Sequence, residues 1–232
     1  MKIIKDIRLY KSETENTDGN PMPQNLAAKS VHVALHRVAM KLREQEFVLG
    51  DFDHLYLNFT PCITKGAFQL AKRTVDRYFP WYRYYDVGID EEMFDKLDSS
   101  EYADFILESA KQVLLNCFCD NADWEQKITN AFIEAKKGEN MLVRFKVKQG
   151  AKYKAVIFLR YLESAEYSPL LCVYNPDGAE ILREDLPPTA DLSSIGEIQL
   201  SSKRVTVKPR KNSFSKDLTD ISFDLQHFIT AK

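Results

Sequence analysis

The feature that most constrains how this chain folds is an aromatic-rich stretch, residues 51–89, which holds ten of the 27 Phe, Trp and Tyr residues. Within it, Leu55, Leu57 and Phe59 alternate with more polar neighbours. An alternation of two residues is typical of a strand with one buried face and one amphipathic face. A second strand is predicted over residues 81–88, where rings occupy both sets of alternating positions. The stretch therefore predicts a pair of aromatic strands.

The composition is that of a globular protein. The chain has 232 residues, 44% of them hydrophobic, which is enough for a substantial core. It contains no run of eighteen apolar residues, and its first sixteen residues lack the apolar centre of a signal peptide. The four cysteines show neither a CxxC nor a zinc-ribbon spacing, so free thiols are expected. We expect a cytoplasmic protein that does not engage a membrane.

Helical periodicity dominates the first part of the chain outside the aromatic stretch. Residues 2–10 have the composition of a strand, and residues 11–25 that of a polar loop. Apolar residues from Val31 to Leu42 recur at the helical period, which predicts a helix over 26–46. A short helix is predicted after Asp90. Two longer helices, over 99–119 and 120–137, have so short a link that we expect an antiparallel pair.

Strand patterns dominate after residue 139. A hairpin is predicted over 142–161, and a second hairpin is predicted around the turn Asn175–Gly178, where proline and glycine suit a type I turn. Shorter strands are expected at 197–200 and 205–208, whereas 218–229 fits either a strand or a short helix. The pattern predicts an α+β fold with N-terminal helices and an aromatic strand pair, followed by a mainly antiparallel sheet. We expect a mixed helical and strand lobe over 1–138 and a mainly β lobe over 139–232, although a single domain with one core is equally compatible.

Few residues suggest catalysis. The sequence contains no GxSxG, GxGxxG or Walker A motif, so neither a nucleophile nor a nucleotide cofactor is expected. One alternative is a metal-dependent enzyme. His32 and His36 are four residues apart on a predicted helix, and Asp51, Asp53 and His54 follow it. The glutamate of the metalloprotease motif is missing from this pair, so we expect no metal and no enzymatic activity.

The charge distribution favours a protein partner. Fourteen acidic residues and only five lysines lie between residues 86 and 139, although the net charge of the chain is only -2. The basic run at 203–211 suggests nucleic acid, but lysines and proline also protect sheet edges, and the acidic segment would repel a phosphate backbone. Nucleic-acid binding is therefore not expected.

An aromatic strand beside a helix with an acidic face is typical of a protein interface, because aromatic side chains supply contact energy and charges steer the encounter. The expected anchors are Trp81, Arg83 and Tyr85 on the second aromatic strand. Carboxylates expected to steer the encounter with a partner are Asp90, Glu91, Glu92, Glu101, Asp104 and Glu108. A further alternative is a structural or assembly protein that forms a homodimer through the aromatic strand.

The order of features over residues 51–92 resembles that of bacterial immunity proteins. An aspartate-rich turn is followed by DHLYLNFTPCI, a basic middle, RYFPWYRYYDVGI and an acidic helix. These proteins are encoded beside polymorphic or contact-dependent toxins. The resemblance implies a cytoplasmic, non-catalytic protein that binds and occludes one toxin domain, often a basic nuclease. It also implies binding roles for the carboxylates and rings named above.

Overall fold

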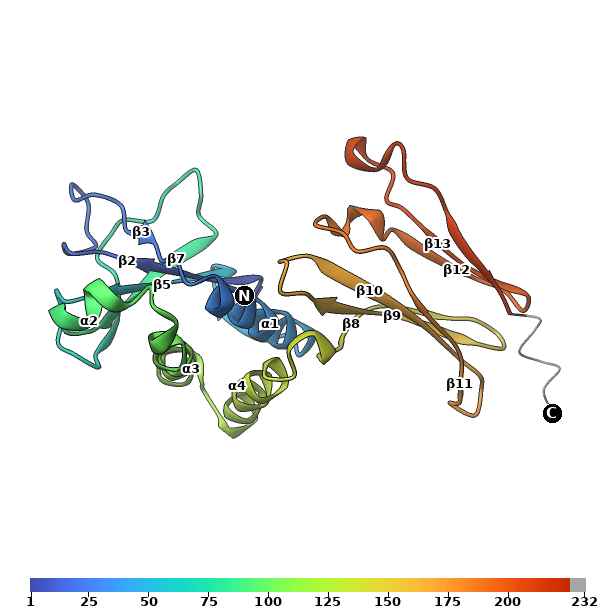
Figure 1. Ribbon diagram of the computed structural model, residues 1–232, viewed down its shortest axis with the longest axis horizontal. Coiled ribbons are helices and arrows are strands. Elements are labelled where there is room, and N and C mark those ends of the chain that lie inside the picture. Colours follow the sequence, from blue (N-terminus) through green and yellow to red (C-terminus); the bar gives the residue numbers. More distant parts are fainter. Residues whose placement is uncertain (226–232) are drawn as a thin grey trace. The chain divides into compact units, whose positions relative to one another are not determined.

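A computed structural model describes residues 1–225 of the chain (Figure 1). The chain divides into two compact units, Met1–Gly138 and Glu139–Lys232. Helices and strands are mixed, and most strand pairs are antiparallel, which confirms the predicted α+β class. Within the described residues, no helix is both long and apolar enough to cross a membrane.

The N-terminal unit is built on a five-stranded sheet. Its strand order is β3 (Gln24–Asn25), β2 (Asp6–Lys11), β5 (His54–Thr60), β7 (Tyr82–Gly88) and β6 (Phe68–Leu70). The three central strands β2, β5 and β7 are parallel, and the two short edge strands pair with them antiparallel. The two predicted aromatic strands, β5 and β7, are thus direct neighbours. A separate small sheet pairs β1 (Lys2–Ile3) with β4 (Val48–Gly50).

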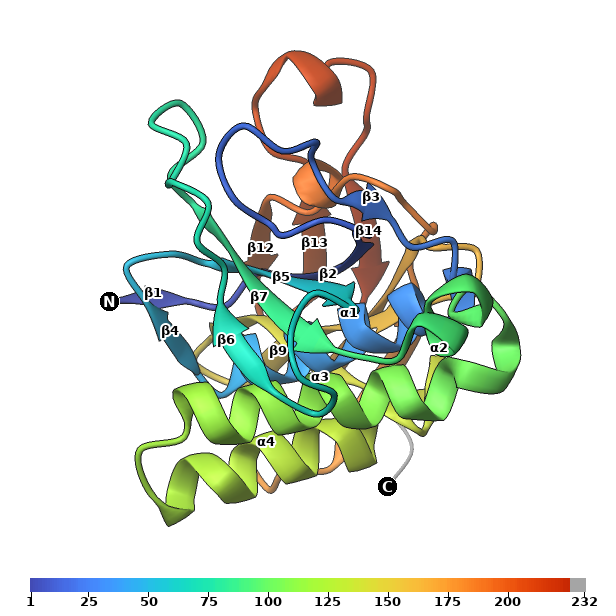
Figure 2. The ribbon, with the colours of Figure 1, turned by 90° about the vertical axis from the view of Figure 1, so that its left-hand side faces the viewer.

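Helices pack against one side of this sheet. Helix α1 (Lys29–Glu44) connects β2 to β5, because two parallel neighbours need a crossover connection. Helices α3 (Ala103–Phe118) and α4 (Ala122–Ala135) lie below the sheet in Figure 1 and run side by side in Figure 2. The short helix α2 (Glu91–Lys96) follows β7 directly. Both predicted longer helices are confirmed, with ends a few residues from those expected.

Local side-chain bonds set the helix starts. Asn121 begins α4, because its side-chain oxygen accepts the Trp124 backbone N–H at 3.0 Å. A 3₁₀ turn, η1 (Ser100–Tyr102), leads into α3, and Ser99 Oγ accepts the Glu101 N–H at 3.3 Å. Asp90 precedes α2 but makes no side-chain capping bond, in contrast to its predicted role as N-cap. A second 3₁₀ turn, η2 (Gly138–Asn140), follows α4.

Both faces of β5 are buried, which differs from the sequence prediction. Leu55, Leu57 and Phe59 have no exposed surface, as expected for its apolar face. The alternate residues Asn58 and Thr60 are also at most 1% exposed. The loops over 12–25 and 71–81 rise from the side of the sheet opposite α3 and α4 (Figure 1). Asn58 donates to Ser12 of the first loop and to Asp86 of β7, and Thr60 Oγ1 accepts the backbone N–H of Cys62. The sequence predicted only an amphipathic face here because nothing local marks these loops as a cover.

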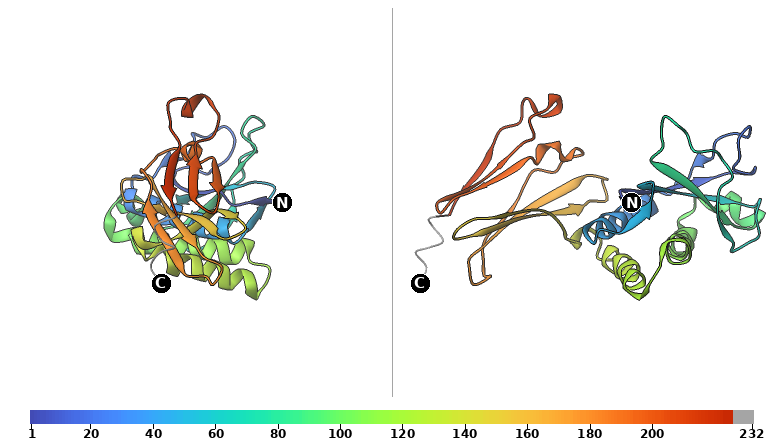
Figure 3. Two further views of the ribbon diagram at one scale, coloured as in Figure 1. Left: turned by 90° about the vertical axis from the view of Figure 1, so that its right-hand side faces the viewer. Right: turned by 180° about the vertical axis from the view of Figure 1, so that it is seen from behind.

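The C-terminal unit consists of two antiparallel sheets. The first has the order β11 (Glu180–Asp185), β10 (Tyr167–Tyr174), β9 (Lys154–Tyr161) and β8 (Val143–Gln149). The second has the order β12 (Glu197–Leu200), β13 (Arg204–Lys208) and β14 (Ile221–Asp224), as Figure 3 shows from two sides. Two 3₁₀ turns are present, η3 (Leu192–Ser194) and η4 (Ser213–Ser215).

The predicted hairpins of this unit are confirmed. In the turn between β10 and β11, Gly178 has a φ of 83° and donates its N–H to the Asn175 carbonyl at 3.0 Å. The β8–β9 hairpin contains a register shift between Arg144 and Lys146, which the clean alternation of the sequence did not indicate. The ambiguous segment at 218–229 contains the strand β14, and its residues beyond 225 lie outside the described part of the chain.

Candidate functional site

Exposed apolar side chains gather at the connection between β6 and β7. We call residues 71–81 the aromatic loop; with Leu70 before it, this segment exposes large apolar side chains at five positions, Leu70, Val75, Tyr78, Phe79 and Trp81. Tyr78 alone is 70% exposed. Elsewhere in the described residues such side chains are scattered over distant segments. A concentration of exposed rings marks an interaction surface more often than a solvated loop.

The aromatic loop is fixed to the neighbouring loop over 12–25. Arg73 donates to the Asn16 side-chain oxygen at 2.8 Å and to the carbonyls of Asn20 and Pro21 at 3.0 and 2.9 Å. The Thr74 backbone N–H and hydroxyl both donate to the Asp18 carboxylate. These bonds order the loop before any partner arrives, which lowers the entropic cost of binding.

The rings of the loop are also arranged by local contacts. Phe79 and Trp81 meet edge to face, with ring centroids 5.1 Å apart. Asp76 accepts the backbone N–H groups of Tyr78 and Phe79 at 2.7 and 3.3 Å. The Arg77 guanidinium lies 4.8 Å from the centre of the Tyr78 ring and donates to its hydroxyl. The loop therefore presents three rings and a guanidinium in a defined arrangement.

A cluster of four tyrosines lies on the sheet face opposite the helices; we call Tyr10, Tyr56, Tyr82 and Tyr84 the tyrosine cluster. Tyr56 stacks on Tyr82 with centroids 4.6 Å apart and an interplanar angle of 9°. Tyr10 lies 5.0 Å from Tyr56 and 5.2 Å from Tyr84, centroid to centroid. Burial raises the pKa of Tyr56 to about 12 and that of Tyr84 further. These phenols stay protonated at neutral pH, so the cluster is a packing platform and not a source of bases.

A buried carboxyl group adjoins the tyrosine cluster. Asp86 is 4% exposed and accepts the side-chain amides of Asn58 at 2.8 Å and Asn16 at 3.4 Å. Burial raises the pKa of Asp86, and the two amides offset part of that effect. Since Asn16 also accepts from Arg73, hydrogen bonds connect the centre of the sheet to the aromatic loop.

The cavity beside Asp86 is very small. Its volume is about 20 Å³, and Thr60 and Cys62 contribute to its lining. That space holds about one water molecule. The arrangement can fix a loop, but it offers no room for a substrate.

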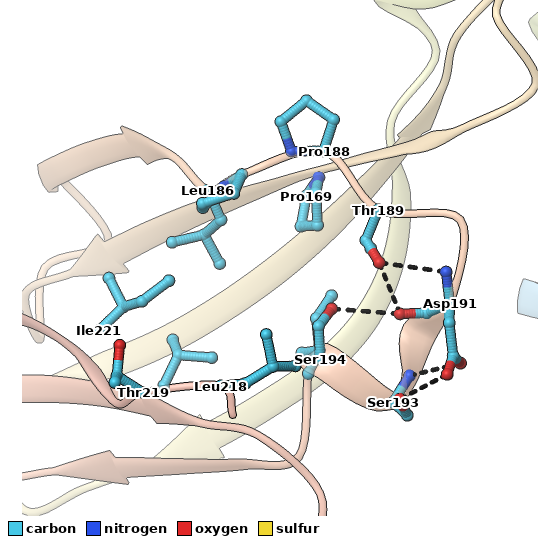
Figure 4. A pocket seen from close by; sticks show the side chains of 13 residues that line it. Pro169, Leu186, Pro188, Thr189, Asp191, Ser193, Ser194, Leu218, Thr219 and Ile221 are labelled. Atoms are coloured by element: carbon cyan, nitrogen blue, oxygen red, sulfur yellow. Dashed lines mark hydrogen bonds between the residues drawn. The ribbon is translucent and has the colours of Figure 1, made fainter. Parts of the chain in front are cut away.

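The C-terminal unit has a larger pocket between its two sheets (Figure 4). The pocket has a volume of about 290 Å³, and its walls are mostly apolar side chains such as Leu186 and Ile221. Two of its hydroxyls, those of Thr189 and Ser194, donate to the Asp191 carbonyl, at 2.7 and 3.2 Å. The Asp191 carboxylate accepts from Ser193. These polar groups are therefore less available to a ligand than the rings of the aromatic loop.

The structure separates the three predicted anchors. Trp81 belongs to the aromatic loop and is exposed. Arg83 instead points toward the helix side, where it pairs with Asp51 at 2.6 Å. Tyr85 packs against Phe118 of α3 with centroids 5.0 Å apart. Both are held by contacts within the unit, so only Trp81 of the three lies on the exposed aromatic surface.

The sequence analysis did not predict the tyrosine cluster, for two reasons. Alternation along β7 shows that Tyr82 and Tyr84 share a face, but it does not show which face the helices cover. Tyr10 comes from β2, distant in the sequence, and reaches the tyrosine cluster because β2 is a parallel neighbour of β5. The rings of Tyr78 and Phe79, between the predicted strands, were a signal that could have been used.

The predicted carboxylates lie at the other end of β7. Glu91, Glu92, Glu101, Asp104 and Glu108 are exposed on α2, η1 and α3, and Asp90 is half-buried. Two of them have local ion-pair partners, because Asp90 pairs with Lys65 at 2.5 Å and Glu92 with Lys96 at 2.9 Å. Asp90, Glu91 and Glu92 follow β7 directly whereas Trp81 precedes it, and a strand of this length spans about 23 Å. Helix α3, which bears Asp104 and Glu108, lies on the side of the sheet opposite the aromatic loop (Figure 1). The carboxylates and the aromatic loop are therefore two separate surfaces.

The histidines and aspartates of the metal alternative do not converge. The described residues contain no group of three or more metal-ligating side chains. His32 Nε2 lies 2.7 Å from the Leu26 carbonyl, and His36 Nδ1 lies 3.5 Å from Asp6. His54 contacts the Asp53 carboxylate, which also pairs with Lys5 at 2.7 Å, and Asp51 pairs with Arg83. Each of these side chains thus has a partner of its own.

Comparison with known proteins adds no assignment. No protein-family model matches this chain, and no curated protein or solved structure matches it. The exposed surfaces of the chain are therefore the main guide to its function.

Proposed function

We propose that this protein is a non-enzymatic binding module that docks onto another protein through the aromatic loop. The observation that carries this proposal is the set of exposed rings at Tyr78, Phe79 and Trp81 on a loop that Arg73 fixes in place. Aromatic and arginine side chains supply most of the binding energy at protein interfaces. Arg77 beside these rings is suited to pair with a carboxylate at the edge of the interface.

We further propose that the partner is a bacterial toxin domain and that binding neutralises it. The local resemblance of residues 51–92 to immunity proteins supports this choice. The acidic surface of α2 and α3 supports it as well, because long-range attraction would accelerate the encounter with a basic domain. Such steering does not require the carboxylates to lie beside the rings. Rings that anchor the complex and carboxylates that attract the partner can therefore occupy different parts of the N-terminal unit.

Co-expression tests this proposal directly. The toxin domain would be taken from the reading frame next to that of this protein and expressed with the wild-type chain or with a Phe79→Ser/Trp81→Ser double variant. We expect the wild type to restore growth and the double variant to fail. Val147→Ser is the matched control, because Val147 is 48% exposed on the C-terminal unit, and it should protect as the wild type does. Growth restored equally by all three proteins would contradict docking through the aromatic loop.

A homodimer is the second candidate, since the same exposed rings could contact a second copy of the chain. Light scattering on the purified protein distinguishes the two, because one chain has a mass of 26.8 kDa. A dimer that becomes monomeric in the Phe79→Ser/Trp81→Ser variant would assign the aromatic loop to self-association. A monomer in both proteins would support docking onto a different protein.

A further inference from the structure

A groove runs between α3 and α4, with α1 as its floor. Figure 2 shows the two helices side by side, and the cavity between them has a volume of about 470 Å³. Val38 of α1 lies at the bottom and is 1% exposed, whereas Leu107 of α3 and Phe132 of α4 are half-buried along the walls. All of its lining residues belong to the N-terminal unit.

The lip of the groove has an apolar side chain that nothing in the described chain covers. Ile133 of α4 lines the groove and is 56% exposed. With Leu107 and Phe132 beside it, this position extends an apolar strip along the axes of two neighbouring helices. Such a strip has the shape that receives the apolar face of another helix.

Charge along the α3 wall indicates which kind of helix fits. Asp104 and Glu108 line the groove, and Glu101 lies about one turn before them. All three are exposed, and none of them forms an ion pair with a lysine or arginine of the described residues. Between residues 90 and 108 the sequence has eight acidic residues and one lysine. This wall is therefore suited to a basic flank.

The helix macrodipole accounts for only part of this acidic wall. Carboxylates in the first turn, such as that of Asp104, stabilise α3 through their attraction to the positive end of the helix dipole, without any partner protein. Glu108 lies beyond the first turn, where the dipole effect has faded, and it accepts a hydrogen bond from the side-chain amide of Gln112 at 2.7 Å. Lys111 of α3 and Lys136 of α4 line the groove as well, so the α3 wall keeps a net negative charge and the α4 wall has a positive one. This asymmetry would fix the orientation of a bound helix.

We propose that this groove binds an amphipathic helix of a partner protein, with its apolar face on Phe132 and Ile133 and a basic flank against the Asp104–Glu108 wall. The bound helix would add a fourth member to the α1, α3 and α4 group. Its apolar residues would recur every three to four positions, as helix-in-groove recognition requires. The site is separate from the aromatic loop, so it does not depend on the proposed docking of that loop.

Synthetic peptides test the groove with the full chain. One amphipathic peptide of about 18 residues has leucines on one face and lysines on its flanks, and a second has glutamates in place of the lysines. Calorimetry should show the lysine peptide binding about tenfold more tightly than the glutamate peptide, with the difference shrinking as salt is added. Equal affinity of the two peptides would overturn the proposed charge recognition.

Variants locate the bound peptide. Ile133→Asp should abolish binding of the lysine peptide, and Glu101→Gln/Asp104→Gln/Glu108→Gln should reduce it to the level of the glutamate peptide. Glu125→Gln, an exposed acid of α4 that does not line the groove, is the control for charge and should change nothing. Circular dichroism checks that each variant remains folded. A folded Ile133→Asp protein that binds as the wild type does would overturn the proposal.

Two further outcomes are decisive. Self-association that disappears in Ile133→Asp would assign the groove to a second copy of this chain and contradict a partner helix. Loss of peptide binding in Phe79→Ser/Trp81→Ser would place the peptide on the aromatic loop instead. Peptide binding that is retained in that double variant would support the groove as a site separate from the aromatic loop. This result would hold even if the proposed function of the aromatic loop is wrong.

Discussion

The central strand β5 of the N-terminal sheet is buried on both faces, but each face is buried by different means. On the helix side, Leu57 and Phe59 are covered by regular helices and stabilise the fold through apolar contact. On the opposite side, Tyr56, Asn58 and Asp86 are covered by two loops and held by stacking and hydrogen bonds. A loop that covers a sheet face cannot bury all of its own side chains, so some of the rings on the aromatic loop remain exposed to solvent. The difference explains why the candidate docking surface lies on the loop side.

The largest expected effect lies on the helix side. Leu57→Ala removes a side chain with no exposed surface and leaves a cavity, so the free energy of unfolding should fall by about 2–5 kcal/mol. Urea unfolding followed by circular dichroism measures this change. A loss below about 1 kcal/mol would mean that the helix side does not form the tightly packed core described above.

A smaller effect is expected where the two loops are connected. Arg73→Ala removes three hydrogen bonds to the loop over 12–25 and should cost about 1–3 kcal/mol. It should also make the aromatic loop more sensitive to limited proteolysis. Arg77→Ala is the matched control, since the hydrogen bond and the ring contact that Arg77 makes within residues 1–225 are both to Tyr78 of its own loop, and its stability should stay within about 0.5 kcal/mol of the wild type. Equal protease sensitivity of the two variants would argue against Arg73 as the clamp.

The buried carboxyl group gives the loop side a pH dependence. Burial raises the pKa of folded Asp86 above its unfolded value of 3.8. Well below pH 3.8, Asp86 is protonated in both the folded and the unfolded protein, so it does not lower the free energy of unfolding. As pH rises from 3.8 through the folded pKa, stability is lost, because the carboxyl group ionises more easily in the unfolded chain than in its buried site. Asp86→Asn cannot ionise, so its stability relative to the wild type should be greater at neutral pH than below pH 3.8.

The measurement for Asp86 is urea unfolding of both proteins over a range of pH. The stability difference between Asp86→Asn and the wild type should grow as pH rises above 3.8 and then level off. A difference that does not change with pH would show that Asp86 ionises equally easily in the folded and unfolded states.

The smallest effect on stability is expected in the aromatic loop itself. Phe79→Ala removes a ring that is 48% exposed, so the free energy of unfolding should change by no more than about 0.5 kcal/mol. A larger loss would show that the ring supports the fold, and it would weaken the argument that the ring is available to a partner. Thermal unfolding of this variant beside Leu57→Ala sharpens the contrast between the two faces.

Local patterns were sufficient to predict most elements but not their assembly. The strand β5, the helix α1 and the Asn175–Gly178 turn all depend on neighbouring residues, and each was confirmed, although the predicted amphipathic face of β5 is buried. The parallel β2–β5–β7 arrangement was not predicted, because it depends on a crossover that no local motif marks. For the same reason Arg83 and Tyr85 were chosen as anchors, although they share the helix-covered face with Leu55 and Leu57. Trp81 was chosen by the same alternation, but it is exposed because it lies just before β7 and not within it.

The most direct test of docking through the aromatic loop is the dissociation rate of the complex with the proposed partner, a toxin domain encoded in the neighbouring reading frame. For Phe79→Ser/Trp81→Ser, loss of two anchors should cost at least about 2 kcal/mol of binding free energy, so we expect dissociation to accelerate by roughly thirtyfold or more. Val147→Ser should dissociate at the wild-type rate. A folded double variant that dissociates as slowly as the wild type would contradict docking through these rings.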